Sequence, residues 1–151
     1  MPANNQAQPG VVADPYRNYR FRIEIQGVEQ GHFAECHGLA ARVQPIRYRE
    51  GGDPGAVRLI PGQVEYAEVS LRYGLTDSYD LWDWFQFGVD GIVDRRNVSI
   101  IVLAPDHSMD AARWNLERCW PCEWRGAPLN GLSNEVAIES VTLAYERLTR
   151  E

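Results

Sequence analysis

The chain has 151 residues, 44% of them hydrophobic, so it is long enough to bury a core as a single domain. Its formal net charge is −6, which argues against a protein that binds nucleic acid through a broad basic face. All 15 of its basic residues are arginine. No apolar run is long enough to span a bilayer, and the first residues, MPANNQAQPG, lack the basic and apolar regions of a secretory signal.

The first element in chain order is a polar arm. Residues 1–13 are rich in polar residues and proline, so we expect a flexible N-terminal arm, followed by one domain over residues 14–151. Phe21, Ile23 and Ile25 then alternate with polar residues, which predicts a strand buried on one side. A turn over residues 26–31 leads into a second extended run over residues 32–36.

A glycine-rich hairpin comes next. Residues 42–49 form an extended run in which Pro45 favours an edge position or a bulge. The segment GGDPG at residues 51–55 consists of turn formers, and the extended pattern resumes at Val57. From Glu65 onward, Ala67, Val69, Leu71 and Tyr73 alternate with polar residues and predict a half-buried strand.

One segment has helical spacing. We expect a helix at about residues 77–88, with an N-cap at Thr76-Asp77, Asp80 in the first turn, and Gly88 and Gly91 as stops. The apolar residues that share its predicted face are Leu81, Trp82, Phe85 and Val89. Asp77, Asp80 and Asp83 recur every three residues, which is typical of a solvated first turn rather than of a cation site.

The rest of the chain also has strand patterns. Residues 98–103 are apolar on both faces, as in a strand between two layers. Trp114, Leu116 and Trp120 alternate with Asn115, Glu117 and Cys119, which predicts another half-buried strand. Near the C-terminus the apolar parity changes at Glu139-Ser140, which suggests a bulge or a strand whose halves face different partners. About eight strands and one helix predict a mainly β fold, a two-sheet β-sandwich or barrel with one flanking helix.

The most distinctive chemical motif is Cys119-Trp120-Pro121-Cys122. A redox C-x-x-C motif needs its first cysteine at a helix N-terminus, whereas this one continues an alternating strand. A zinc site would need further ligands from His32, Cys36 or His37, and neighbouring strand residues point to opposite faces. A small redox or metal-binding protein using Cys119 and Cys122 therefore remains the alternative of another class. The sequence has no nucleophile elbow, paired-carboxylate pattern or P-loop, so we expect no enzyme, cofactor or metal.

Several motifs resemble one known family in order along the chain. They are DPYRNYRFRIEI (residues 14–25), YREGG (48–52), RLIPG (58–62), LTDSYDLWDWF (75–85), RRNVSIIVL (95–103), and RWNLERCWP (113–121) followed by NEVAIESVTLAYE (134–146). The chain resembles the tail tube proteins of contractile phages and of phage-tail-like contractile injection systems.

This resemblance implies a structural subunit of an inner tube. Hexameric rings stack into a hollow tube that a contracting sheath drives through a target envelope, with DNA or protein cargo in the lumen. The implied partners are further copies of the chain, the sheath protein, and baseplate and spike proteins; assembly would occur in the bacterial cytoplasm, without stable membrane insertion. A tube-initiator ring at the baseplate would carry the same motifs, and so would both phage tails and injection particles. The residues expected at the contact between subunits are Arg49, Glu50, Gly51, Gly52, Arg58, Pro61 and Gly62.

Overall fold

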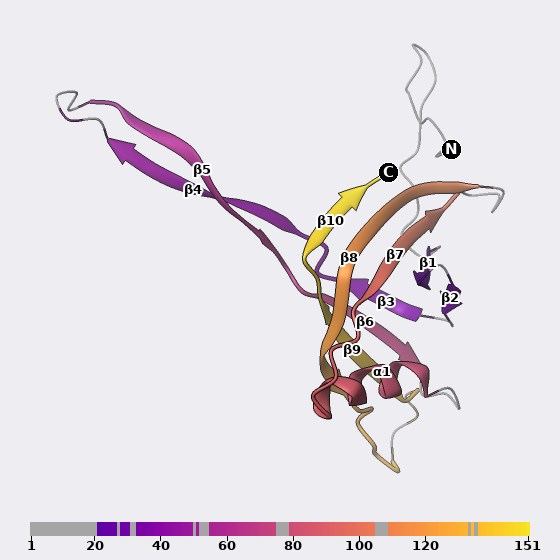
Figure 1. Ribbon diagram of the computed structural model, residues 1–151. Coiled ribbons are helices and arrows are strands. Elements are labelled where there is room, and N and C mark those ends of the chain that lie inside the picture. The colour runs from indigo at the N-terminus through magenta and orange to yellow at the C-terminus, as the bar shows by residue number, and fades with distance from the viewer. Residues whose placement is uncertain are drawn as a thin grey trace.

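The computed structural model describes residues 21–26, 28–30, 33–49, 51, 55–74, 79–104, 109–132, 134 and 136–151. This part of the chain contains ten strands and one helix (Figure 1). They are β1 (Phe21–Ile25), β2 (Val28–Gln30), β3 (Phe33–His37), β4 (Ala41–Arg49), β5 (Val57–Tyr66), β6 (Val69–Gly74), α1 (Asp80–Val89), β7 (Arg96–Leu103), β8 (Asp110–Arg125), β9 (Ile138–Ala144) and β10 (Arg147–Arg150). Within these residues, no helix has the length and apolarity needed to cross a membrane.

Eight strands form one strongly bent sheet, and β4 and β5 form a separate hairpin. The bent sheet has the order β2-β1-β7-β8-β9-β6-β3, with β10 also paired to β8. Strand β8 is 16 residues long; its first part pairs with β7 and its last part with β9, so it belongs to both halves of the sheet. We call the half with β1, β7 and β10 layer A, and the half with β9, β6 and β3 layer B. The path runs from β2 to β3 without closing, so the predicted sandwich is confirmed as an open one rather than a barrel.

The core lies between the two layers. In β1, β6 and β9, alternate residues are buried, as a period-two pattern predicts. Layer A contributes Ile23, Ile25, Val98, Ile100 and Leu116, and layer B contributes Val69, Leu71, Tyr73, Val141 and Leu143. Ile101 is also fully buried, which fits the apolar run over residues 98–103.

The predicted alternation along β8 is wrong after Leu116. Arg118 has a left-handed backbone with φ of 57°, and the register between β7 and β8 shifts there. This bulge inserts one residue and reverses the facing of the residues on its C-terminal side. Cys119 is therefore buried, whereas Trp120 is 40% exposed.

The helix begins later than predicted and buries a different side chain. It spans Asp80–Val89, and Tyr79 at its N-cap makes no side-chain capping bond; the predicted cap at residues 76–77 lies outside the described residues. Trp84 is the fully buried side chain, with Leu81 and Phe85 half-buried beside it, whereas Val89 is exposed. Gly88 lies within the helix, and Gly91, with positive φ, comes after its end.

A predicted turn and a predicted bulge also differ from the structure. The segment after Gln26 forms the short strand β2, which folds back on β1. At the other end, β9 pairs with β6 in continuous register from Ile138 to Leu143, so no bulge occurs at residues 139–140. The apolar residues before the change lie outside the core: Val136 precedes the strand and is exposed, and Ile138, the first residue of β9, is only half-buried.

Candidate assembly interface

The β4–β5 hairpin projects away from the sandwich as a long arm (Figure 1). Its strands pair from Ala41 opposite Tyr66 to Arg49 opposite Val57. Every residue of β4 is exposed, and β4 and β5 contact each other far more than they contact the rest of the fold. A two-stranded ribbon on its own is marginally stable in water, so this arm is built to gain support from another surface.

One face of the arm is mainly apolar. The odd-numbered residues of β4 from Val43 onward lie on this face, together with the β5 residues directly opposite them. Its apolar members are Val43, Pro45, Val57, Leu59, Pro61 and Val64, and it also carries Arg47 and Arg49. Leu59 is 68% exposed, which is unusual for a leucine in a paired strand. A contiguous exposed apolar strip of this kind marks a contact surface. We call these eight residues the hairpin face.

A β-bulge shapes the middle of the arm. The pairing steps from Val43 opposite Val64 to Pro45 opposite Pro61, so β5 contains one extra residue there. Pro45 thus lies at a bulge, as predicted. A side chain at Gly62 would approach the carbonyl oxygen of Gln44 to 2.7 Å, so the bulge requires glycine.

The root of the arm is firmly attached to the sandwich. Gly38 has φ of 96°, and a Cβ added there would collide with the carbonyl oxygen of Glu68. The backbone N–H of Ala67 donates to the carbonyl of Ala40 at 3.0 Å and joins the two strands where they leave the body. The direction of the arm is therefore set by the backbone at its base.

The residues predicted at the contact between subunits belong to this arm wherever the structure describes them. Arg49 lies on the hairpin face, whereas Arg58 pairs with Tyr48 and lies on the opposite face. Pro61 and Gly62 lie at the bulge and Gly51 in the turn. Glu50 and Gly52 lie outside the described residues. Their contact with another subunit remains a prediction.

Exposed apolar side chains also occur in the last turn of α1, in the segment after it and in the loop after β8. The sequence did not predict this surface, because helical spacing placed Val89 on the buried face and the loop residues follow no period. We define the helix–loop patch as Phe87, Val89, Ile92, Val93, Leu129, Leu132 and Val136. Leu129 is 85% and Leu132 is 98% exposed. The rings of Trp82 and Trp124 pack edge to face with centroids 4.6 Å apart, which fixes the helix against the end of β8 where this loop begins.

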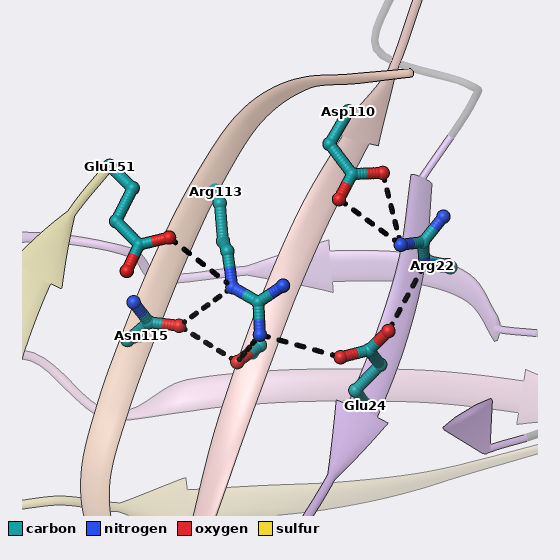
Figure 2. A network of polar contacts seen from close by, with 7 residues as sticks. Arg22, Glu24, Asp110, Arg113, Asn115 and Glu151 are labelled. Carbon is teal, nitrogen blue, oxygen red and sulfur yellow. Dashed lines mark hydrogen bonds and ion pairs between the residues drawn. The ribbon is translucent and has the colours of Figure 1, made fainter. Parts of the chain in front are cut away.

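The outer face of layer A carries a network of charges (Figure 2). Arg113 Nη2 donates to Glu24 Oε2 at 3.4 Å and to Ser99 Oγ at 3.1 Å, and its Nε donates to Asn115 Oδ1 at 3.1 Å. Arg22 connects Glu24 to Asp110, with Nη2 3.0 Å from Asp110 Oδ1. These contacts join β1, β7 and β8, so the network stiffens layer A.

Replacement of Arg113 by methionine should destabilise the fold by about 1–3 kcal/mol, because the largely buried carboxylate of Glu24 loses one of its two arginine partners and Ser99 and Asn115 lose a donor. Urea unfolding measures this. Arg125→Met is the matched control: Arg125 pairs with Glu123 but its side chain is 77% exposed, so a change within about 0.5 kcal/mol is expected. Equal losses in the two variants would contradict a structural role for the network.

The outer face of layer B is also polar. Two rows cross its strands: Glu35, Arg72, Ser140 and Arg125 in one, and His37, Ser70, Thr142 and Glu123 in the other. Glu35 Oε2 lies 2.7 Å from His37 Nε2 and accepts from Arg72 Nη1 at 2.9 Å. These bonds, the one to His37 first, lower the pKa of Glu35. Both broad faces of the sandwich are thus suited to contact with water.

The cysteines lie in surroundings that suppress thiolate formation. Burial raises the pKa of Cys119 to about 12 and that of Cys36 to about 11. The Cys119 thiol donates to the carbonyl of Leu116, and the Cys122 thiol donates to that of Thr142, both at 3.4 Å. Both residues belong to strand β8, not to a helix N-terminus. Redox chemistry needs a lowered thiol pKa, so the geometry favours a packing role.

We expect Cys119→Ser with Cys122→Ser to leave assembly unchanged, and the folded parent chain to react slowly with a thiol reagent at pH 8. Unfolding should expose all three thiols at once. The measurements are a thiol titration with and without denaturant and a zinc assay of the parent. Loss of assembly in the double variant, or stoichiometric zinc, would support the redox or metal-binding alternative.

Comparison with known proteins decides the family. The family model described as T4-like virus tail tube protein gp19 matches residues 17–149, nearly the whole chain. The chain belongs to this tail tube family. No curated protein matches it in sequence. The resemblance inferred from the motifs is thereby confirmed, and the chain is a structural component of the phage-tail-like, contractile-injection class.

Solved structures share the fold. One is a chain of an extracellular contractile injection system, the PVC sheath–tube complex in the extended state, with TM-score 0.79, 23% identity and 91% coverage of both chains. Another is from the tube-terminating cap of the anti-feeding prophage, with TM-score 0.82, 25% identity and 93% coverage of both. A third is from the baseplate of the anti-feeding prophage, with TM-score 0.80, 22% identity, and 93% and 97% coverage of this chain and that one. Chains with this fold thus occur in structures of a sheath–tube complex, a tube-terminating cap and a baseplate.

Proposed function

We propose that this tail tube family member is a structural subunit of the inner tube of a contractile tail or injection system. Hexameric rings of the chain stack into a hollow tube. The observation that carries this proposal is the hairpin, a rigidly rooted arm with an exposed apolar face that has no role within its own sandwich. Such an arm gains its stability only in an assembly.

The sandwich supplies the wall of the tube. Its two layers are tied by a continuous core and by the long strand β8, so the subunit transmits force as a solid body. A surrounding sheath would provide the energy by contracting, and the tube would be pushed through the target envelope. Sheath and baseplate proteins are the expected partners, because structures of those assemblies contain the similar chains.

The polar outer faces fit a water-filled lumen. The chain carries a net charge of −6, so each ring is strongly acidic. Negative charge along a channel repels polyanions and keeps DNA or acidic protein cargo from adhering to the wall. The proposed tube therefore acts as a passive conduit.

The second candidate is a subunit of a specialised ring at one end of the tube. Similar TM-scores to the sheath–tube, cap and baseplate chains favour it as an alternative. Both candidates use the same fold; they differ in whether one ring accepts another identical ring.

Light scattering of the purified chain over a range of concentrations tests the proposal. We expect particles of about six times the 17.2 kDa chain that grow into larger multiples as the concentration rises. Particles that stop at one ring would support the end-ring candidate. A monomer at every concentration, also in the presence of baseplate proteins as a template, would contradict both.

A further inference from the structure

The helix–loop patch consists of large apolar side chains that are exposed to solvent in the single subunit. Its two loop leucines, Leu129 and Leu132, are almost fully exposed, although they lie on a structured turn in which Leu132 N–H donates to Asn130 Oδ1 at 3.0 Å. Large exposed apolar side chains on a structured turn mark a contact surface.

Acidic residues lie beside this patch. Asp80, Asp83, Phe87 and Asp90 are spaced three, four and three residues apart, so they share one face of α1, and all four are exposed. The inner face of the helix carries Trp84 instead. The patch is therefore apolar with a negatively charged border.

The hairpin face has the complementary character. Arg47 and Arg49 accompany its apolar residues, whereas Arg42 on the opposite face of the arm lies across from Glu65. The arm points away from the part of the molecule that carries α1 (Figure 1). With ten residues in β5 and about 3.3 Å per residue, it extends about 30 Å, enough to reach past the edge of its own subunit.

We propose that the helix–loop patch of one copy receives the hairpin face of a second copy. This inference rests on the proposed stacking of rings and identifies the surface that accepts the arm. Two different surfaces of the same molecule meet, so the contact is heterologous and repeats without limit along an axis. Pairing of two hairpins with each other is disfavoured, because it would bring arginines of both arms together in a partly desolvated contact.

Disulfide trapping tests the contact with Leu59→Cys on the hairpin face and Leu132→Cys on the patch. Under mild oxidation, a mixture of the two single variants should give covalent dimers, and a chain with both changes should give a ladder of larger products. Each single variant alone, like the parent, should remain uncrosslinked. Self-crosslinking of Leu59→Cys alone would overturn the proposal in favour of hairpin pairing.

Electron microscopy of the same oxidised samples separates this inference from the proposed function. Tubes without a bond between positions 59 and 132 would show that the arm docks elsewhere and would leave the tube proposal standing. Absence of rings and tubes under all conditions would overturn both.

Charge reversal provides an independent test. Arg47→Asp with Arg49→Asp should reduce the yield of tubes at least about tenfold, because both acidic side chains then face the acidic border of the patch. Adding Asp83→Arg with Asp90→Arg should restore most of the yield. The control, Arg125→Asp with Arg147→Asp, makes the same charge change away from the arm and should not be restored by the helix substitutions. If the arm variants and the control variants lost tube yield, and regained it with the helix substitutions, to the same extent, the proposal would be overturned.

Discussion

A chain that lacks Gly51–Val57 should fold and form rings but should no longer stack them into tubes. The described residues of the arm contact each other far more than the rest of the fold, and none of them belongs to the core, so removal of its outer part should leave the sandwich core intact. The deletion leaves two residues between the paired Tyr48 and Arg58, which is the length of the tightest hairpin connection. Arg49→Asn with Glu50→Gly supplies the residues that such a turn prefers.

The readouts for this variant are electron microscopy for tubes and denaturant unfolding for the fold. The free energy of unfolding of the unassembled subunit should change by less than about 0.5 kcal/mol, as for surface changes elsewhere. The full-length chain with Arg49→Asn and Glu50→Gly is the matched control for the turn substitutions. Normal tubes from the shortened chain would show that the arm has no part in stacking.

Replacement of Trp84 by alanine should cost about 3–5 kcal/mol of folding free energy. Trp84 is 1% exposed and fills the space between α1 and the sandwich. Its indole Nε1 donates to the carbonyl of Asp94 at 2.7 Å, and the Arg96 guanidinium lies 5.0 Å from its ring centre. The substitution removes the packing, the hydrogen bond and the cation–π contact together.

The comparison variant for Trp84→Ala is Trp120→Ala, because Trp120 is 40% exposed. Trp120→Ala should lower the free energy of unfolding by less than about 1.5 kcal/mol, since much of the Trp120 ring remains in water when the protein is folded. Both free energies come from urea unfolding at the same low protein concentration, because assembly adds stability by mass action. Losses of equal size would contradict the assignment of Trp84 as the residue that anchors the helix.

The sandwich was predictable because its strands obey a simple period. Ile23, Leu71 and Val141 lie at positions where alternation places them inside, and all three are fully buried. The alternation failed where the backbone departs from it. Arg118 adopts a left-handed conformation that an arginine in the sequence does not predict. The resulting bulge buries Cys119 and exposes Trp120, the reverse of what the alternation predicts.

The helix shows a different limit. Its apolar residues occur at too many positions to define one face, since Trp82, Trp84, Phe85 and Phe87 are all aromatic. Tertiary packing selects Trp84 through the carbonyl of Asp94, a partner that helical spacing does not reveal.

The hairpin was predictable as an element but not as an arm. Its turn residues and Pro45 indicate the hairpin and its bulge, yet its apolar alternation is the same as that of a strand in a core. Only the three-dimensional structure shows that Val43 and Leu59 face solvent. The helix–loop patch was not predicted, because helical spacing placed Val89 on the buried face and residues 126–137 have no periodic pattern.

Electron microscopy of the purified protein would show directly whether this chain builds a tube. We expect hollow rings with six-fold symmetry that stack along one axis, with the hairpin of each subunit reaching the next ring. Reconstruction of such tubes would also show which polar face lines the lumen. Particles without a ring, in samples that contain baseplate proteins as well as in samples that do not, would rule out the proposed tube.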